Sequence, residues 1–193
     1  DIRLPGGQSL YRELAPEFTW KYKRKWQWSG GIQLLHYNIL QYQNKTDAAD
    51  EKDPVAFWGG GKANYVDAIT PYTEYLYKFS PVRSLRLDAQ YLRSDDEFGS
   101  WINVGAEYGA APHWLFSVSN MYKIPHRHPE RYEAEKTRFD GIFYPSAGVT
   151  YTQKAHRFAL SYIKQVEGIN CAGGICRYEP AFHGVRLQIN SSF

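Results

Sequence analysis

The chain has 193 residues, the length of one domain, and a formal net charge of only +3 with acidic and basic residues interleaved. This balance excludes the strongly basic character expected of a nucleic-acid-binding protein. Aromatic residues make up 17% of the chain, although its mean hydropathy of −0.56 is polar. Many rings without long apolar runs are unusual for a soluble core and typical of strands whose alternate residues meet lipid and water.

No stretch reaches the roughly 18 apolar residues of a membrane-spanning helix. The first residues, DIRLPGGQSL, lack the basic and apolar regions of a signal peptide. We therefore expect either that a leader has been removed or that the chain begins inside a longer one.

Hydrophobicity alternates with period two along most of the chain, which predicts β-strands. Segment 84–94 is an example, because Leu85 and Leu87 alternate with Arg86. Nine such segments follow in chain order: 10–24, 28–43, 63–80, 84–94, 99–109, 112–123, 142–154, 156–167 and the C-terminal GVRLQINSSF.

The connections between these segments alternate between tight turns and longer polar loops. The tight ones are RKWQW, SPVRS, GAAPH and QKAHR. This alternation is typical of a transmembrane β-barrel, which has short periplasmic turns and longer outer loops. We predict an antiparallel transmembrane β-barrel, with residues 1–193 as a single barrel domain or the C-terminal part of one. A soluble β-protein is the alternative.

Aromatic residues gather at both ends of the predicted strands, as in the two aromatic belts of membrane proteins. The predicted belt near the tight turns contains Tyr22, Trp26, Trp28, Tyr77, Phe79, Tyr108, Trp114, Tyr151, Phe158 and Phe193. The predicted belt near the long loops contains Tyr42, Tyr65, Tyr91, Trp101, Tyr122, Tyr144 and Phe182.

The predicted strand count is odd, whereas single-chain bacterial barrels have an even count and both ends in the periplasm. With periplasmic turns, the C-terminus is periplasmic and Asp1 lies on the outer side. Three explanations remain open. Further strands precede Asp1 in a larger even-stranded barrel; segment 10–24 is an extension of an eight-stranded barrel; or several chains pool strands. The clean alternation of segment 10–24 favours the first.

The last strand carries a family resemblance. Val185, Leu187 and Ile189 alternate toward the terminal Phe193, and this pattern resembles the last strand of Gram-negative outer-membrane proteins. The resemblance implies that these four residues form the signal read by the barrel assembly machinery. It also implies an outer-membrane location, with lipid and lipopolysaccharide as surroundings.

A second likeness precedes this strand. The stretch EGINCAGGICRYEPAFHGVRL is similar to the last extracellular hairpin of outer-membrane barrels from Bacteroidota, which have no assigned function. Its two glycines let the backbone turn back between Cys171 and Cys176, so we predict a disulfide there. An oxidising cell surface favours this bond.

The polar positions of the strands predict the interior of the barrel. The charges predicted to face the lumen are Glu74, Lys78, Arg86, Asp88, Glu107 and Arg186. A lumen that carries both positive and negative charges is either filled with water or crossed by ion pairs. About eight strands leave a filled interior, whereas about sixteen leave a channel.

These patterns predict a non-enzymatic channel or transport barrel for small polar solutes. The alternatives are an accessory barrel that partners other outer-membrane complexes and a membrane-embedded hydrolase. His36, Asn38 and Ser161 supply hydrolase residue types but no recognisable spacing. His126 and His128 lie in a loop that we expect to be exposed to solvent. We therefore predict no catalytic residue, no metal, no cofactor and no nucleic-acid partner.

Overall fold

The computed structural model describes residues 2–3, 9–38, 65–94, 99–131, 137–172 and 175–192. For residues 2–3, 9–10, 131, 168–172 and 175–179 it describes the backbone only. The described residues are almost entirely β-structure, with a short 3-10 helix at Pro129–Arg131. No helix among them is long and apolar enough to cross a membrane.

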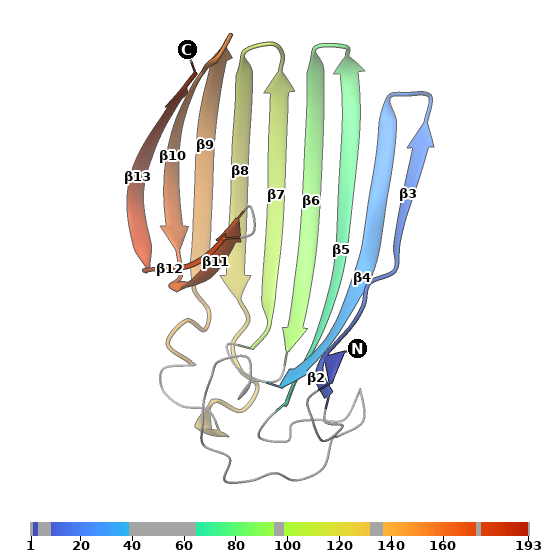
Figure 1. Cartoon of the computed structure of the whole chain (residues 1–193), viewed down its shortest axis with the longest axis vertical. Coiled ribbons are helices and arrows are strands. Elements are labelled where there is room, and N and C mark those ends of the chain that lie inside the picture. The colour runs from blue at the N-terminus through green and yellow to red at the C-terminus, as the bar shows by residue number, and fades with distance from the viewer. Residues whose placement is uncertain are drawn as a thin grey trace.

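One large antiparallel sheet dominates the molecule (Figure 1). Its eleven strands are β1 (Ile2–Arg3), β2 (Ser9–Leu14), β3 (Glu17–Tyr22), β4 (Trp26–Asn38), β5 (Tyr65–Ser80), β6 (Arg83–Ser94), β7 (Trp101–Ala110), β8 (Trp114–Lys123), β9 (Phe143–Gln153), β10 (His156–Gln165) and β13 (Phe182–Ser191). The remaining strands, β11 (Gly168–Ala172) and β12 (Ile175–Glu179), form a separate hairpin between β10 and β13.

Each of the nine predicted segments forms part of this sheet, and each long strand pairs with the next along the chain. The all-β antiparallel prediction is therefore confirmed. The first segment is interrupted at Pro16, which divides it into β2 and β3. Both parts pair with β4: Leu14 lies opposite Leu34, and Glu17 lies opposite Gly31. Segment 10–24 is thus part of the sheet rather than an extension outside it.

The connections sort by length to the two ends of the sheet (Figure 1). We call these the turn end and the loop end. Backbone hydrogen bonds continue the ladder across neighbouring turns: Lys78 N donates to Lys25 O at 2.8 Å, Ala111 N to Val82 O at 2.8 Å, and Thr152 N to His113 O at 2.8 Å. The turn end is therefore a connected rim rather than a set of independent hairpins.

The sheet is curved but not closed (Figure 1). At one edge β13 pairs only with β10, and at the other β2 and β3 pair only with β4 apart from the short β1. Both edge strands, β3 and β13, run toward the turn end (Figure 1). Direct closure of β3 on β13 would therefore be a parallel pair, unlike every described pair. Barrel closure is not seen in these residues.

The pairing registers give the sheet two chemically different faces. We call them the apolar face and the polar face. Large hydrophobic side chains are exposed on the apolar face: Leu14, Phe18, Trp20, Tyr22, Trp26, Trp28, Phe79, Leu87, Tyr91, Ile102, Val104, Trp114, Phe116, Val118, Phe143, Phe158, Leu160, Tyr162, Val185, Leu187 and Ile189.

Few apolar residues are buried by comparison. Among the described residues the buried hydrophobic side chains are Val66, Ala68, Phe139 and Tyr144, all toward the loop end. A soluble domain covers its apolar face with another layer. In the described part of this chain no second layer covers the middle of the sheet.

Candidate functional site

Charged residues from three neighbouring strands meet on the polar face. Arg86 on β6 lies between Glu74 on β5 and Glu107 on β7. Its Nε is 3.8 Å from a Glu74 carboxylate oxygen, and its Nη1 is 3.6 Å from a Glu107 carboxylate oxygen. All three side chains are partly exposed, so each pair contributes little stability in water. The arrangement instead fixes one positive charge between two negative ones.

A third carboxylate adds to this group. Asp88 lies opposite both Glu74 and Gly105 in the pairing registers. A Cβ atom on Gly105 would lie 2.5 Å from Asp88 Oδ1, so glycine makes room for the carboxylate to lie against the sheet. The cluster formed by Glu74, Arg86, Asp88 and Glu107 has a formal charge of −2, because three acidic groups surround one arginine.

The same row of the polar face continues with small side chains. Glu107 lies opposite Ser117, Ser117 opposite Gly148, and Gly148 opposite Ser161. Ser161 then lies opposite Arg186 on the edge strand β13. Small polar residues leave space and hydrogen-bonding groups for water, so the polar face of β8–β10 is suited to contact an aqueous solution.

A second group of charges lies at the loop end, around Asp140. Its carboxylate lies 3.0 Å from Lys123 Nζ and accepts a 2.8 Å hydrogen bond from the backbone N of His126. His126 Nδ1 is 3.0 Å from the same carboxylate. Lys123 is fully buried, with 0% of its side chain exposed. A buried ammonium is stable only with a partner, so Asp140 holds residues 123–126 in place.

The pKa of Asp140 reflects these contacts. Burial raises the pKa of the carboxyl, but hydrogen bonds from the His126 backbone, Lys123 and His126, together with the charge of Lys123, outweigh burial and lower it. Asp140 is therefore ionised at neutral pH and acts as a structural anion. The sequence pattern did not identify this cluster, because its members come from a strand end and from a loop.

Three aromatic residues of the predicted loop-side belt lie on the polar face: Trp101, Tyr144 and Phe182. Trp101 lies opposite Lys123, whose Nζ is 5.7 Å from the ring centroid. The Trp101 ring centroid is 5.8 Å from that of Tyr144. The prediction that these three residues belong to an interfacial belt is therefore wrong. Trp101 and Tyr144 pack on the polar face beside the Asp140 cluster, and the Phe182 ring centroid lies 5.5 Å from the Arg186 guanidinium on the same face. Tyr91 and Tyr122 do lie on the apolar face.

The structure places the other predicted residues as follows. All six predicted lumen charges share the polar face: Glu74, Lys78, Arg86, Asp88, Glu107 and Arg186. Val185, Leu187 and Ile189 of the predicted assembly signal share the apolar face, with exposures of 65%, 65% and 57%. Phe193 and Tyr42 lie outside the described residues. Lumen exposure and recognition by an assembly machinery stay predictions.

The β11–β12 hairpin brings the two cysteines into register. Cys171 lies directly opposite Cys176 in the backbone pairing. Their side chains lie outside the described part of the structure, so the disulfide stays a prediction. Directly opposed positions of an antiparallel pair have Cβ atoms about 4.5–5.5 Å apart, which a small adjustment brings to disulfide distance.

The residue types considered for hydrolysis are not assembled. His36 on β4 has its Nδ1 2.7 Å from Asp67 Oδ1 and its ring stacked on Tyr65. Ser161 is on β10 and faces the opposite side of the sheet. His128 Nδ1 is 3.3 Å from Glu130. Within the described ranges, no three His, Cys, Asp or Glu side chains come together as a metal site.

The fold and its two faces define the class of protein: an all-β chain built on one long antiparallel sheet, apolar on one side and polar on the other. Residues 4–193 match the model of a family of unknown function (DUF6029), and the chain belongs to that family. No curated protein and no solved structure matches the chain.

Proposed function

We propose that this sheet forms the wall of a transmembrane β-barrel in a bacterial outer membrane, and that the barrel is a non-enzymatic channel for small polar solutes. The observation that carries the proposal is the chemical difference between the two faces. Val118 on β8 is 57% exposed on the apolar face, while its neighbours Ser117 and Ser119 lie on the polar face. Lipid on one side and water on the other account for this alternation.

The strand lengths support the same proposal. Strands β7, β8, β10 and β13 each have 10 residues, and β9 has 11. A tilted β-strand needs about 9–11 residues to cross a bilayer. The aromatic side chains near the turn end, such as Trp26, Trp114 and Phe158, are exposed on the apolar face, where a membrane–water interface favours them.

The two edges of the sheet require further pairing in this proposal. Unpaired backbone groups cost several kcal/mol each in lipid, so an open edge in the bilayer is unstable. Because β3 and β13 run in the same direction, closure by antiparallel pairs alone needs an odd number of additional strands. Such a barrel is wider than the one that would form if this sheet closed directly from β3 to β13.

The polar face favours a water-filled interior over one filled by side chains. The row from Ser117 through Gly148 to Ser161 offers little side-chain volume. Large side chains there would be expected if the interior were packed. The acidic cluster around Arg86 would then lie at the water-filled surface and favour the passage of cations.

Planar-bilayer recording of the purified protein tests this function. We expect discrete conductance steps. Glu107→Gln removes one charge of the acidic cluster and should lower the cation preference measured by the reversal potential in a salt gradient. Val118→Ala on the opposite face is the matched control and should leave the reversal potential unchanged. Absence of conductance steps at any voltage would contradict the proposed channel function.

The open edges also favour a second function, an accessory barrel that pairs with strands of another outer-membrane protein. The exposed edge of β13 offers backbone donors and acceptors for such pairing. Co-purification from native membranes in mild detergent tests it. Recovery of the chain alone would exclude a stable partner.

A further inference from the structure

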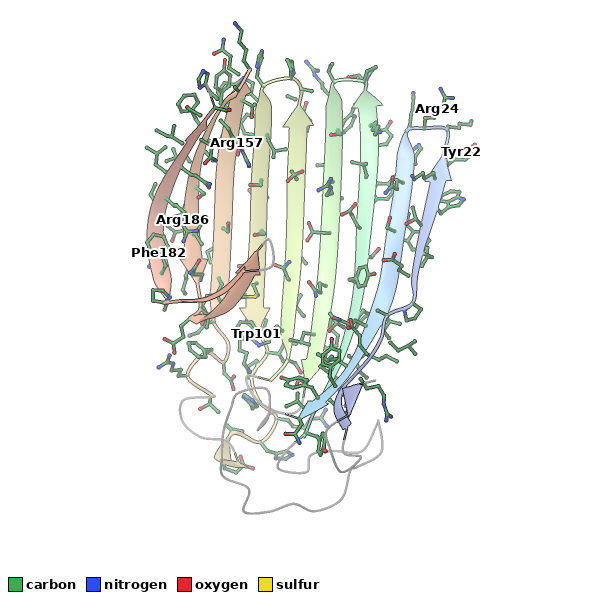
Figure 2. All side chains as sticks on the ribbon, in the orientation of Figure 1. Tyr22, Arg24, Trp101, Arg157, Phe182 and Arg186 are labelled. Carbon is green, nitrogen blue, oxygen red and sulfur yellow. The ribbon has the colours of Figure 1, made fainter. Side chains whose placement is uncertain are left out.

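The turn end of the sheet is uniformly basic. The four stretches that form it, 18–28, 75–85, 108–118 and 148–160, contain no Asp or Glu. They contain eight cationic residues, which we call the basic rim: Lys21, Lys23, Arg24, Lys25, Lys78, Arg83, Lys154 and Arg157. All eight are exposed, and none is ion-paired with a carboxylate among the described residues. Arg24 and Arg157 lie at this end in Figure 2.

The β3–β4 turn has charged residues at two positions where its backbone conformation favours Asn and Gly. Lys25 N donates to Tyr22 O at 3.2 Å, and the two central residues, Lys23 and Arg24, have φ of 48° and 55°. Positive φ at both central positions defines a type I′ turn, which strongly prefers Asn-Gly. Lys and Arg adopt this conformation at a cost, and a local rule broken in this way points to a role other than folding.

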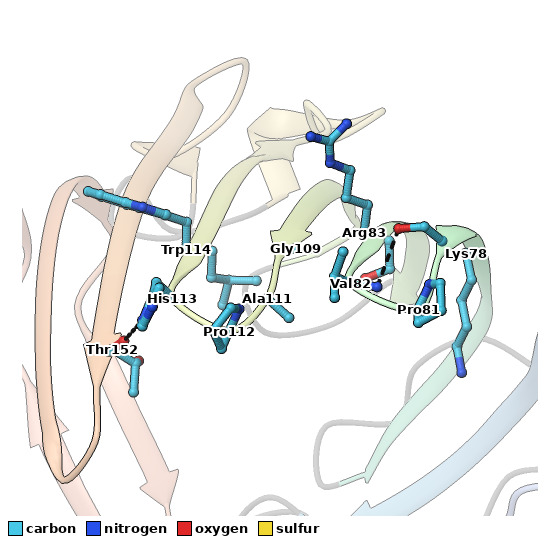
Figure 3. A pocket seen from close by; sticks show the side chains of 13 residues that line it. Lys78, Pro81, Val82, Arg83, Gly109, Ala111, Pro112, His113, Trp114 and Thr152 are labelled. Carbon is cyan, nitrogen blue, oxygen red and sulfur yellow. Dashed lines mark hydrogen bonds between the residues drawn. The ribbon is translucent and has the colours of Figure 1, made fainter.

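Hollows lie on the polar side of the rim. One of about 290 Å³ is lined by four cations, Lys21, Arg24, Lys25 and Lys78, together with Trp26 and Leu76. Beside it, a hollow of about 370 Å³ lies between the β5–β6 and β7–β8 turns, and its lining includes Lys78, Arg83 and His113 (Figure 3). Cations therefore line the polar side of the rim as well as the turns themselves.

Aromatic side chains border the rim on the apolar face. The ring centroids of Trp26 and Tyr77 are 4.2 Å apart, and those of Trp114 and Tyr151 are 4.7 Å apart. Lys23 Nζ lies 5.0 Å from the Tyr22 ring centroid. Rings at the edge of an apolar band, followed at once by basic residues, match the chemistry of a membrane–water interface with anionic head groups.

From these observations we propose that the basic rim binds the phosphate head groups of anionic glycerophospholipids in the leaflet at the turn end. This inference rests on the membrane location proposed above. A lipid surface is favoured over a protein partner because the cations extend from β3 to β10 along the rim and adjoin the aromatic residues throughout. Head groups would meet the exposed cations of the turns themselves, such as Lys23, Arg24 and Lys154, while acyl chains lie against the apolar face.

Tryptophan quenching in vesicles tests the proposal, because Trp20, Trp26, Trp28 and Trp114 lie on the apolar face near the rim. The protein is inserted into mixed phosphatidylcholine and phosphatidylglycerol vesicles in which either one lipid or the other is brominated. We expect brominated phosphatidylglycerol to quench more strongly, with a relative binding constant of about five, the factor that one basic residue contributes at an anionic surface. High salt should reduce this preference.

The double variant Lys23→Asn/Arg24→Gly removes two charges and supplies the preferred turn sequence, so it should fold at least as well. Its phosphatidylglycerol preference should fall severalfold. Arg93→Gln/Arg127→Gln removes the same charge from the loop end, where both residues line a separate hollow, and should keep the preference. Equal loss in both double variants, or equal quenching by both lipids in the unmodified protein, would overturn the proposal.

Two further outcomes separate the alternatives. If inorganic phosphate abolishes the preference more than chloride at equal ionic strength, the rim is a site for small phosphates and not for lipid. If neither brominated lipid quenches, the sheet is not in the bilayer, and the membrane location fails together with this inference. A channel without lipid preference would leave the proposed function intact and remove the inference alone.

Discussion

At the scale of single residues, Asp140 shows how a loop is fixed to the end of a sheet. It contacts a fully buried lysine, and removing one partner of such a pair leaves the other charge uncompensated. We expect Asp140→Ala to lower the free energy of unfolding by about 3 kcal/mol. The double variant Lys123→Met/Asp140→Leu should recover much of that loss. Urea unfolding in lipid vesicles, followed by tryptophan fluorescence, measures both. Equal destabilisation by the single and double variants would contradict the coupling.

The lowered pKa of Asp140 gives a pH prediction with a definite sign. A carboxyl whose pKa is depressed in the folded state stabilises that state at every pH above its ordinary value of about 3.9, and this contribution is lost as pH falls through the folded value. We therefore expect the stability difference between the unmodified protein and Asp140→Asn to be constant from about pH 7 to about pH 5 and to shrink below about pH 4. A difference that stays constant from about pH 5 down to about pH 2 would contradict it.

At the scale of strands, the two faces of β8 should respond oppositely to charge. Val118→Arg places a guanidinium on the apolar face, and a lipid-facing Arg near the bilayer midplane costs about 2–4 kcal/mol. Ser119→Arg, one residue further and on the polar face, should cost much less because its side chain reaches water. Urea unfolding in vesicles compares the two. Similar costs for both variants would show that the apolar face does not meet lipid.

Period-two alternation was sufficient to find the strands, because each one alternates independently of its neighbours. The predicted belt was wrong for Trp101, Tyr144 and Phe182, because nearness to a loop does not fix which face of the sheet a side chain occupies. Trp101 directly precedes the apolar-facing Ile102, so its parity already places it on the polar face. The Asp140 cluster could not be predicted from the sequence, because residues 123, 126 and 140 come into contact only in the folded structure.

The net charge of the chain likewise does not predict how charges are distributed over the sheet. A net charge of +3 with interleaved signs conceals a turn end without acidic residues. The asymmetry becomes visible only when turns far apart in sequence are placed side by side, as the strand order does. Residues that share an edge of a sheet must be compared as a set, because proximity along the chain does not group them.

At the scale of the whole molecule, the direction of the edge strands decides how the sheet is completed. Copies of this chain that cross a membrane in the same direction would join β13 of one to β3 of the next in parallel. Antiparallel closure instead requires intervening strands that run the other way, so β3 and β13 of one chain should not touch.

Cysteine cross-linking in a Cys171→Ala/Cys176→Ala background tests this arrangement of the edge strands. The register pair Ala159→Cys/Gln188→Cys should cross-link readily, because its Cα atoms are opposite each other. Thr19→Cys or Lys21→Cys combined with Gln188→Cys should form no bond within one chain, since all three positions are on the polar face but at opposite edges. Efficient intrachain cross-linking of either pair would mean that the sheet closes on itself from β3 to β13 through a parallel seam, and the interior would then be too narrow for the proposed channel.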